Sequence, residues 1–331
     1  MGRAMTIHHL DPAIEEPTVP CDIAARLAAL RAHTVSIGET LPGGYVLRTL
    51  LGSGGMGRIF LAEQRSLGRE VAIKVAHAHL ESAHDMSNRL SIEALAMSRV
   101  RHRSSVAIYD LRTRADGVPF VVMERVRGQS LTSLVRQGPL EARRAVNLVV
   151  QLLGALEEAH DSGVLHRDVK PDNIVVTNDH GTERVILIDY GLALIRDGKR
   201  VVGATVPGVM YGTPGYMSPE QSEGARVDAR TDVYSSAVVL HTLLTGAFPA
   251  RRIPSASRTS LRSRRIAPRV DASLGEPLAA VLTGALDEAP ARRPASAATF
   301  ASALQACVPV ARRRPVPAMA RGVATRLLDC G

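Results

Sequence analysis

The stretch that decides the fold reads VLHRDVKPDNIVV and covers residues 164–176. Apolar segments typical of β-strands flank a polar run that holds a His, an Arg, a Lys, two Asp and an Asn. Charge placed between apolar segments is costly unless the groups are paired or needed for function. We therefore treat Asp168, Lys170 and Asn173 as candidate functional residues.

The composition predicts a folded protein with a sizeable core. The chain has 331 residues, of which 45% are hydrophobic, while aromatics are only 3% and Trp is absent. Ala, Val and Leu must therefore fill the core. The net charge of +9 suits an anionic partner such as a nucleotide, an acidic protein or a nucleic acid, and on its own it selects none of them.

The three cysteines, Cys21, Cys307 and Cys330, lie far apart and form no C-x-x-C or zinc-binding spacing. This usage is typical of a reducing compartment and predicts a cytoplasmic protein. Charged residues interrupt every apolar run well before 18 residues, so no membrane-spanning helix is expected.

Upstream of the opening stretch, the pattern predicts a small β-rich unit with one helix. Strand-like runs separated by Gly or polar turns cover residues 45–51, 58–64, 70–76, 106–112 and 120–126. Between the third and fourth runs, residues 84–100 are predicted as a helix that places Leu90, Glu93 and Met97 on one face.

Downstream, the pattern becomes helical. Residues 140–160 carry apolar side chains at a period near 3.6, and residues 231–245 are apolar on nearly every face, which indicates a buried helix. Two further helices are expected at about 276–289 and 295–307. The predicted fold class is α+β with two lobes, a small β-rich one joined near residue 125 to a larger, mainly helical one.

The sequence LGSGGMGRIF contains the pattern G-x-G-x-x-G at Gly52, Gly54 and Gly57. Glycines let backbone N–H groups approach phosphate oxygens, so the motif points to a nucleotide. A P-loop is excluded, because Arg58 and Ile59 follow the last glycine where Lys and Ser or Thr are needed. A dinucleotide-binding fingerprint is excluded because the next residues are strand-like. A plain hairpin turn remains an alternative for this motif alone.

Lys74 ends the sequence VAIK on the next predicted strand and has apolar neighbours. An ammonium group in a crevice needs an anionic partner, and Glu93 on the inward face of the following helix can supply one. The pair would let Lys74 hold phosphates while Glu93 holds Lys74. An edge-strand lysine in water is the alternative interpretation of Lys74 taken alone.

The order of the motifs resembles one known family. The run HRDVKPDN is similar to the catalytic loop of eukaryotic-type serine/threonine protein kinases, including those of bacteria. That family also has a Gly-rich loop, a strand lysine, a D-F-G triplet and an A-P-E triplet. In the same order, this chain reads GSGGMG, VAIK, HRDVKPDN, DYG at 189–191 and SPE at 218–220. The resemblance covers approximately residues 45–308 and implies a two-lobed protein-kinase-like fold.

The resemblance also implies roles for the polar residues. Asp168 would accept the proton of a substrate hydroxyl, and Lys170 would lie beside the transferring phosphate. Lys74 and Glu93 would complete the catalytic set. His166 is expected to be structural rather than a base.

The implied cofactors are ATP and Mg²⁺, for which Mn²⁺ could substitute. Asn173 and Asp189 would hold the metal, because hard cations prefer oxygen ligands. The nucleotide would lie under the Gly-rich loop, between apolar walls and against the backbone that follows Met123. The predicted cofactor-binding residues are Leu51, Gly52, Ser53, Gly54, Gly55, Met56, Gly57, Ile59, Ala72, Lys74, Met123, Glu124, Val126, Asn173 and Asp189.

The chain departs from the family pattern at several points. Tyr190 stands where the family has Phe, and the effect of its additional hydroxyl on packing stays open. Ser218 replaces the Ala of the A-P-E triplet, whose Glu220 is expected to pair with Arg293. Ala237 stands where Gly is common, and we have no physical account of that change.

The resemblance further implies regulation by phosphorylation. Arg167, just before Asp168, is typical of kinases activated through the loop between residues 189 and 220. Thr213 matches the position that shapes the substrate pocket and bonds the catalytic Asp and Lys. Thr205 is then the predicted phosphorylation site, where a phosphate would add close to two negative charges for Arg167 to pair. The alternative is that Thr205 is a plain loop threonine.

The predicted organisation is an N-terminal extension over 1–43, a kinase domain over 44–308 and a basic, flexible tail over 309–331. The lobe boundary is expected at residues 125–126. The Arg-rich segment 251–269 is interpreted as a solvated loop, with a docking site as the alternative.

The predicted function is transfer of the ATP γ-phosphate to Ser or Thr hydroxyls of protein substrates, with autophosphorylation of the loop that holds Thr205. A pseudokinase scaffold that binds nucleotide or partners without catalysis is the alternative. It is disfavoured because Lys74, Asp168 and Asp189 are all present. Nucleic-acid binding is not expected, because no recognised motif or aromatic platform accompanies the basic segments. The oligomeric state is not predicted.

Overall fold

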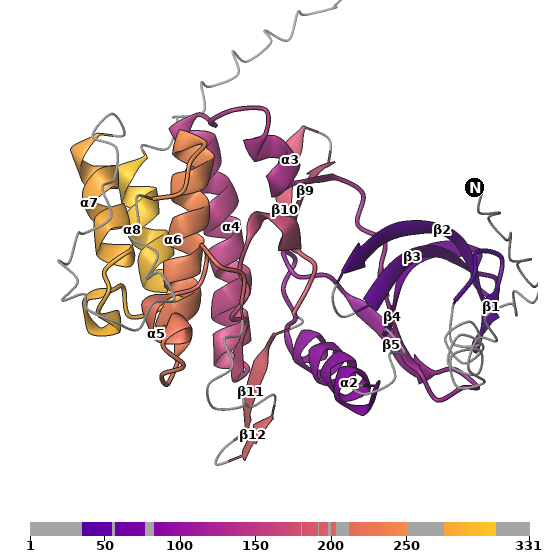
Figure 1. Cartoon of the computed structure of the whole chain (residues 1–331). Coiled ribbons are helices and arrows are strands. Elements are labelled where there is room, and N and C mark those ends of the chain that lie inside the picture. The colour runs from indigo at the N-terminus through magenta and orange to yellow at the C-terminus, as the bar shows by residue number, and fades with distance from the viewer. Residues whose placement is uncertain are drawn as a thin grey trace, which may run out of the picture.

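The computed structural model describes residues 35–54, 57–76, 83–179, 181–190, 192–197, 200–202, 212–249 and 275–308. Several predicted features lie outside the described residues, namely positions 1–34, Gly55, Met56, Thr205, the segment 251–269 and the tail from residue 309. Figure 1 shows a curled sheet with one helix beside it, followed by a larger helical lobe. The two-lobed α+β fold predicted from the sequence is confirmed.

The N-lobe is built on one antiparallel sheet in the order β1-β2-β3-β4-β6-β5. Its strands are β1 (Thr40–Leu41), β2 (Tyr45–Gly54), β3 (Gly57–Gln64), β4 (Arg69–Ala76), β5 (Ile108–Thr113) and β6 (Pro119–Glu124). Apolar side chains on its inner face, among them Leu47, Ile73 and Phe120, are almost completely buried. All five predicted strands are present.

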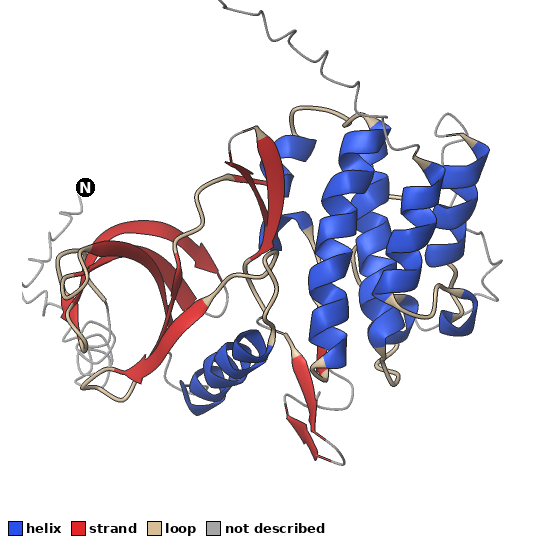
Figure 2. Ribbon diagram, turned by 180° about the vertical axis from the view of Figure 1, so that it is seen from behind, coloured by secondary structure: helices blue, strands red, loops and turns tan. Residues whose placement is uncertain are grey.

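Helix α2 (Ala83–Arg99) packs beside this sheet, as Figure 2 shows. Leu90, Glu93 and Met97 are each only 2% exposed, so the predicted face is the buried one. Two of these residues are apolar, and the third is a carboxylate inside the protein. Glu93 therefore needs a cationic partner.

The C-lobe is organised around two long helices, α4 (Ala142–Asp161) and α6 (Ala229–Thr245). The Glu141 carboxylate caps the first turn of α4 by accepting from two backbone N–H groups. Helix α6 is buried on all sides and ends at Gly246, whose φ of +71° is left-handed and suits glycine. Further helices are α3 (Leu131–Val135), α5 (Pro219–Ser222), α7 (Glu276–Ala285), η3 (Pro290–Arg292) and α8 (Ala297–Cys307).

Helix α7 is shorter than the sequence pattern predicts, because it ends at Ala285 rather than near residue 289. The Asp287 side chain accepts a hydrogen bond from the Ala289 N–H, and the Asp287 carbonyl accepts one from Arg293. These bonds compete with helical ones, and Pro290 disfavours helix for the residue before it.

Two small sheets carry the polar run between the lobes. One has the order β10-β9-β7, formed by β10 (Thr182–Leu187), β9 (Ile174–Asp179) and β7 (Gln129–Ser130). The other has the order β12-β11-β8, formed by β12 (Arg200–Val202), β11 (Leu194–Asp197) and β8 (Val164–Leu165). The polar run follows β8, passes through the short helix η1 (Pro171–Asn173) and enters β9. Among the described residues, no helix is both long and apolar enough to cross a bilayer.

Candidate active site

Lys74, Glu93 and Asp189 come from three separate elements and meet at the junction of the lobes. Lys74 lies on β4, Glu93 on α2, and Asp189 just after β10. The Lys74 ammonium donates hydrogen bonds to both Glu93 carboxylate oxygens, at 2.6 and 2.8 Å, and lies 3.3 Å from both Asp189 oxygens. Lys74 and Glu93 are buried, whereas the Asp189 side chain is 30% exposed. The cluster is therefore accessible from the Asp189 side.

Two carboxylates share one ammonium in this cluster. Burial alone would lower the pKa of Lys74, but the charges of Glu93 and Asp189 outweigh burial and raise it above its ordinary value. Burial and the Asp189 charge raise the pKa of Glu93 to about 8, against the opposing effect of Lys74. Lys74 therefore stays cationic and faces both acidic side chains.

Asn173 and Asp189 present oxygen atoms from neighbouring chain segments. The Ile188 N–H donates to the Asn173 main-chain carbonyl at 2.9 Å, which holds the two segments together. The Asn173 side-chain NH₂ donates to the Asp168 carbonyl at 2.9 Å, so its amide oxygen remains available as an acceptor. A carboxylate and an amide oxygen are the donors that hard divalent cations prefer, so these residues fit such a cation.

Three side chains hold the Asp168 carboxylate, and one of them is Asn173, whose Nδ2 atom donates to Asp168 Oδ2 at 3.2 Å. Lys170 donates to Asp168 Oδ2 at 2.7 Å, and Thr213 donates to Asp168 Oδ1 at 2.8 Å. Lys170 also donates to the Thr213 hydroxyl at 2.7 Å, which closes the triangle. A carboxylate in this position can accept a proton from an alcohol bound beside it.

Asp232, in the first turn of α6, holds the backbone of the polar run. Its carboxylate accepts the His166 N–H at 2.9 Å, the Arg167 N–H at 2.8 Å and His160 Nε2 at 2.8 Å. Burial opposes ionisation of Asp232, but these hydrogen bonds outweigh it and lower its pKa. Arg167 has a φ of +64°, a left-handed conformation that costs on the order of 1–3 kcal/mol for a non-glycine residue. The Asp232 bonds hold the backbone in that conformation.

Gln221 also holds the backbone of Arg167, through the carbonyl group. The sequence interpretation missed Gln221. Its Nε2 atom donates to the Arg167 carbonyl at 2.7 Å, and its Oε1 atom accepts the Ser218 N–H at 3.1 Å. Ser218 and Gln221 form a capping box at the start of α5. The spacing S-x-x-Q was the signal that could have found Gln221.

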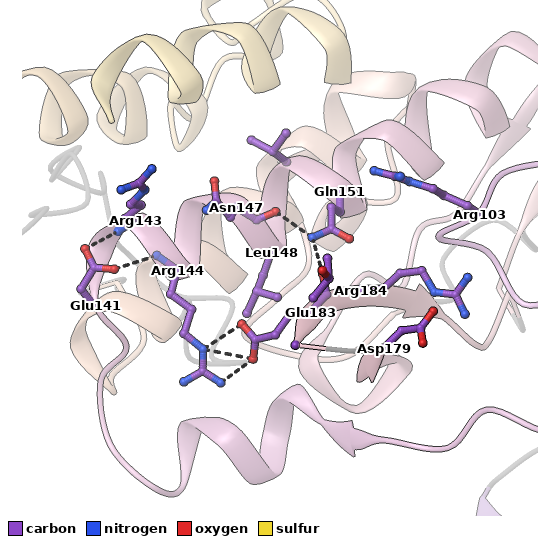
Figure 3. Close-up of a pocket in the computed structure, with 13 residues that line it drawn as sticks. Arg103, Glu141, Arg143, Arg144, Asn147, Leu148, Gln151, Asp179, Glu183 and Arg184 are labelled. Atoms are coloured by element: carbon purple, nitrogen blue, oxygen red, sulfur yellow. Dashed lines mark hydrogen bonds and ion pairs between the residues drawn. The ribbon is translucent and has the colours of Figure 1, made fainter. Parts of the chain in front are cut away.

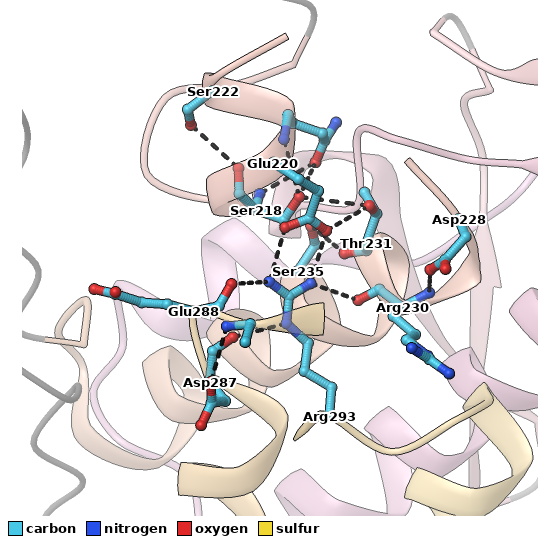
Figure 4. A network of polar contacts seen from close by, with 12 residues as sticks. Ser218, Glu220, Ser222, Asp228, Arg230, Thr231, Ser235, Asp287, Glu288 and Arg293 are labelled. Atoms are coloured by element: carbon cyan, nitrogen blue, oxygen red, sulfur yellow. Dashed lines mark hydrogen bonds and ion pairs between the residues drawn. The ribbon is translucent and has the colours of Figure 1, made fainter. Parts of the chain in front are cut away.

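Glu220 is fixed by Arg293 within the network drawn in Figure 4. Arg293 donates to the two Glu220 oxygens at 2.7 and 2.8 Å, and Thr231 donates to Glu220 at 2.8 Å. The Arg293 side chain is completely buried. The expected Glu220–Arg293 pair is therefore present, and it attaches the end of the loop that carries Thr213 to the helices of the C-lobe.

The predicted adenine-contacting residues line the region where the lobes join. Ala72 on β4 pairs with Met123 on β6, and both are buried. Ile59 and Val126 pack against the same apolar cluster, and Glu124 is half-buried. In the glycine-rich hairpin, the described residues Leu51, Gly52, Ser53, Gly54 and Gly57 belong to β2 and β3, and Leu51 is exposed.

Of the predicted regulatory residues, Arg167 and Thr213 are described. Besides its backbone contacts, Arg167 donates through Nε to the Leu192 carbonyl at 2.7 Å, so its side chain reaches the segment that leads towards Thr205. That segment forms β11 and β12, which the sequence interpretation did not predict.

A separate hollow of about 840 Å³ lies between α4 and the β9–β10 hairpin (Figure 3). Arg144 binds the Glu183 carboxylate there at 2.8–3.2 Å, and Gln151 bonds the backbone of β10. None of the predicted site residues lines it. Its polar groups dock the helix onto the hairpin, so we place the candidate active site at the junction of the lobes.

Comparison with known proteins agrees with this geometry. The family described as protein kinase domain matches residues 45–305. Serine/threonine-protein kinase pkn3 of Myxococcus xanthus is 38% identical over 286 residues, which are 84% of this chain and 52% of that protein. Serine/threonine-protein kinase PknB of Mycobacterium tuberculosis is 39% identical over 210 residues, which are 62% of this chain and 33% of that protein. The chain thus spans about half or less of the length of these relatives.

A solved structure shows the same fold. The crystal structure of the Mycobacterium tuberculosis PknI kinase domain superposes with a TM-score of 0.63 at 28% identity, covering 83% of this chain and 100% of that domain. The family match extends over most of the sequence and includes every motif described above. The chain therefore belongs to the protein kinase family, among the eukaryotic-like serine/threonine kinases of bacteria.

Proposed function

We propose that this protein transfers the γ-phosphate of ATP to Ser and Thr hydroxyls of protein substrates. The observation that best supports this proposal is the convergence of Lys74, Glu93 and Asp189 from distant parts of the chain. Family membership supports it as well. In this proposal, Lys74 would bind a phosphate group of ATP and the Asp189 carboxylate would bind a metal ion.

The catalytic residues act on the proton and on the phosphate charge. As the substrate oxygen bonds to the γ-phosphorus, the bond from that phosphorus to the bridging oxygen of ADP breaks, and Asp168 accepts the hydroxyl proton. Lys170, 2.7 Å from Asp168, places its charge beside the transferring group. Magnesium, held by Asn173 and Asp189, would neutralise phosphate charge when bound.

The experiment that tests this function compares wild type with Asp168→Asn, using labelled ATP and a generic basic protein. Loss of a general base commonly costs about a hundredfold or more in rate. The matched control is Asp172→Asn, which changes an exposed carboxylate in the same loop. We expect Asp172→Asn to keep its activity. Equal incorporation by wild type and Asp168→Asn would overturn the assignment of Asp168.

The pseudokinase alternative predicts a different result in the same assay. A scaffold would bind nucleotide but incorporate no label, with or without Asp168. The complete set of motif residues favours catalysis: Lys74 contacts Asp189, and Asn173 donates a hydrogen bond to the Asp168 carbonyl.

We further infer that Thr205 is phosphorylated by the kinase itself, because Arg167 contacts the segment leading to it. Mass spectrometry of protein incubated with ATP, beside a Lys74→Met variant, tests this inference. Phosphate on Thr205 in wild type alone is the expected result, and undiminished activity of Thr205→Ala would contradict a switch at this position.

We place the protein in the cytoplasm, on the basis of its widely separated cysteines and its lack of apolar runs long enough for a membrane span. We also propose that its substrates are proteins with Ser or Thr hydroxyls, and that it uses Mg²⁺, for which Mn²⁺ can substitute. Activity assays with each metal, and fractionation of cells that produce the whole protein, test these points.

A further inference from the structure

Tyr190 places a hydroxyl group in the interior of the protein, beside the metal-binding position. It follows Asp189 in the chain and is completely buried. A buried tyrosine hydroxyl normally has a hydrogen-bond partner, because leaving it unpaired costs free energy. Here the partner is the Ser105 hydroxyl, at 3.2 Å. Either hydroxyl can donate in this contact, because Ser and Tyr hydroxyls are both donors and acceptors.

Ser105 is held rigidly next to the strand that ends before Asp189. It lies in the segment between α2 and β5, which forms a parallel bridge from Ser105 to Leu187. The Leu187 N–H donates to the Ser104 carbonyl at 2.8 Å, and the Val106 N–H donates to the Leu187 carbonyl at 3.0 Å. The Ser105 hydroxyl therefore has a fixed position relative to β10.

The Tyr190 ring is also held in place, by the His166 ring. The His166 ring packs against it with the centroids 4.7 Å apart, and His166 is itself held by Asp232 through its N–H. The Ala193 N–H donates to the Tyr190 carbonyl at 2.8 Å. Tyr190 is thus restrained through its hydroxyl, its ring and its backbone, and the hydroxyl contact is the one that a phenylalanine could not make.

We propose that Ser105 is a positioning residue, whose hydroxyl holds Tyr190 in place and thereby keeps the adjacent Asp189 carboxylate directed towards Lys74 and the metal-binding position. This inference rests on the proposed function, because it assigns Asp189 to metal binding. Since Ser105 follows α2, the contact also links the helix that carries Glu93 to Asp189. The Tyr190 hydroxyl therefore adds a restraint between the two lobes.

The test is a mutant cycle made of Ser105→Ala, Tyr190→Phe and the double variant. Ser104→Ala is the matched control, because Ser104 is also buried but its hydroxyl has no hydrogen-bond partner among the described residues. The primary measurement is binding of a non-hydrolysable ATP analogue by calorimetry, with and without Mg²⁺. Thermal unfolding of every variant is measured in parallel.

Ser105→Ala leaves the Tyr190 hydroxyl unpaired in the interior. We expect its Mg²⁺-dependent affinity to fall about tenfold, with metal-free binding changed less than about twofold. The turnover rate should fall in parallel, at an unchanged KM for the protein substrate. Tyr190→Phe removes the same contact and should lose Mg²⁺-dependent affinity as well. The double variant should lose no more than the single variants, because each of them already lacks the contact. Ser104→Ala should behave like wild type.

A purely structural role would give another pattern. If Ser105→Ala lowers the melting temperature but keeps wild-type Mg²⁺-dependent binding, or if the losses of the two single variants add up in the double variant, the positioning role is refuted. If Ser105→Ala does not fold, Tyr190→Phe decides, since it removes the same contact without leaving a phenol unpaired. Absence of Mg²⁺-dependent binding in wild type itself would instead overturn the proposed function.

Discussion

The Thr213 hydroxyl donates a hydrogen bond to the Asp168 carboxylate across 2.8 Å, although 45 residues separate them in the chain. Because the same hydroxyl accepts from Lys170, Thr213 sets the relative position of the proposed base and the adjacent cation. The loop that carries Thr213 is thus part of the candidate active site, and its conformation controls the geometry of Asp168.

Thr213→Ala should therefore reduce turnover, by up to about a hundredfold, because misplacement of a catalytic group by about an ångström has that effect. Thr213→Ser keeps the hydroxyl and should retain most of the activity. Steady-state kinetics at saturating ATP measure both variants. Equal activity of the Ala and Ser variants would show that the hydroxyl is not needed.

In the glycine-rich hairpin, substitution of two glycines by alanine should have different effects on stability. A Cβ atom at Gly57 would lie 2.3 Å from the Val75 carbonyl oxygen, whereas one at Gly52 would meet nothing within 4 Å. We expect Gly57→Ala to destabilise the protein by about 1–3 kcal/mol, as overpacking does. Gly52→Ala should keep the wild-type melting temperature and weaken nucleotide binding only. Denaturation and nucleotide titration separate the two effects, and a destabilised Gly52→Ala would contradict the hairpin geometry.

Gln221 should be needed for turnover, because it bonds the carbonyl of Arg167 just before Asp168. Gln221→Glu keeps an oxygen for the Ser218 N–H but loses the donor to Arg167. We expect it to lower turnover about tenfold or more while the protein remains folded. Circular dichroism checks the fold and labelled-ATP assays check the rate. Full activity of Gln221→Glu would remove Gln221 from the positioning network.

Arg293 should contribute strongly to stability, because its side chain is completely buried and paired with Glu220. Arg293→Ala leaves a buried carboxylate without its cation, which typically costs about 3–5 kcal/mol. The control is Arg292→Ala, whose side chain is 67% exposed and lies 3.8 Å from Asp287. That variant should lose less than about 1 kcal/mol. Urea denaturation measures both, and similar losses would contradict the burial argument.

Stability should also fall on acidification, because the Glu220–Arg293 pair needs an ionised Glu220. Burial opposes ionisation of Glu220, but the hydrogen bonds from Arg293 outweigh it and lower the pKa of Glu220 below its ordinary 4.5. The unfolded chain therefore binds a proton before the folded protein does. The stability due to this carboxylate is fully present above pH 4.5 and is lost as the pH falls through the lowered value.

Glu220→Gln removes this titration. Its unfolding free energy should be lower than that of wild type at pH 7, and the difference should narrow as the pH falls below about 4.5. Urea midpoints measured from pH 7 to pH 3 follow the difference. A gap that stays constant over this range would contradict a lowered pKa for Glu220.

Much of the fold and the site could be predicted from the sequence, because the signals were local. Helix α2 and its inward face followed from the spacing of Leu90, Glu93 and Met97, and α6 from an uninterrupted apolar run. The motif order identified Lys74 and Asp168 as candidate site residues, since each lies in a short pattern of residue types that phosphoryl transfer requires.

Other features depended on contacts between distant segments. No local pattern marks Ser105 as the partner of Tyr190, because 85 residues separate them and a serine in a loop has many roles. The end of α7 depended on Arg293 bonding the Asp287 carbonyl. Strand β11 formed because it pairs with β8.

The sequence by itself thus determined which chemistry is available, namely the carboxylates, the ammonium groups and the amide oxygen, and the helices and strands that carry them. Only the tertiary structure decided how these groups are held. The strained Arg167 between Asp232 and Gln221, and Tyr190 between Ser105 and His166, exist because folding places side chains from different elements at hydrogen-bonding or packing distance. Local sequence encodes periodicity and residue type, but it does not encode which distant group will satisfy a buried polar atom.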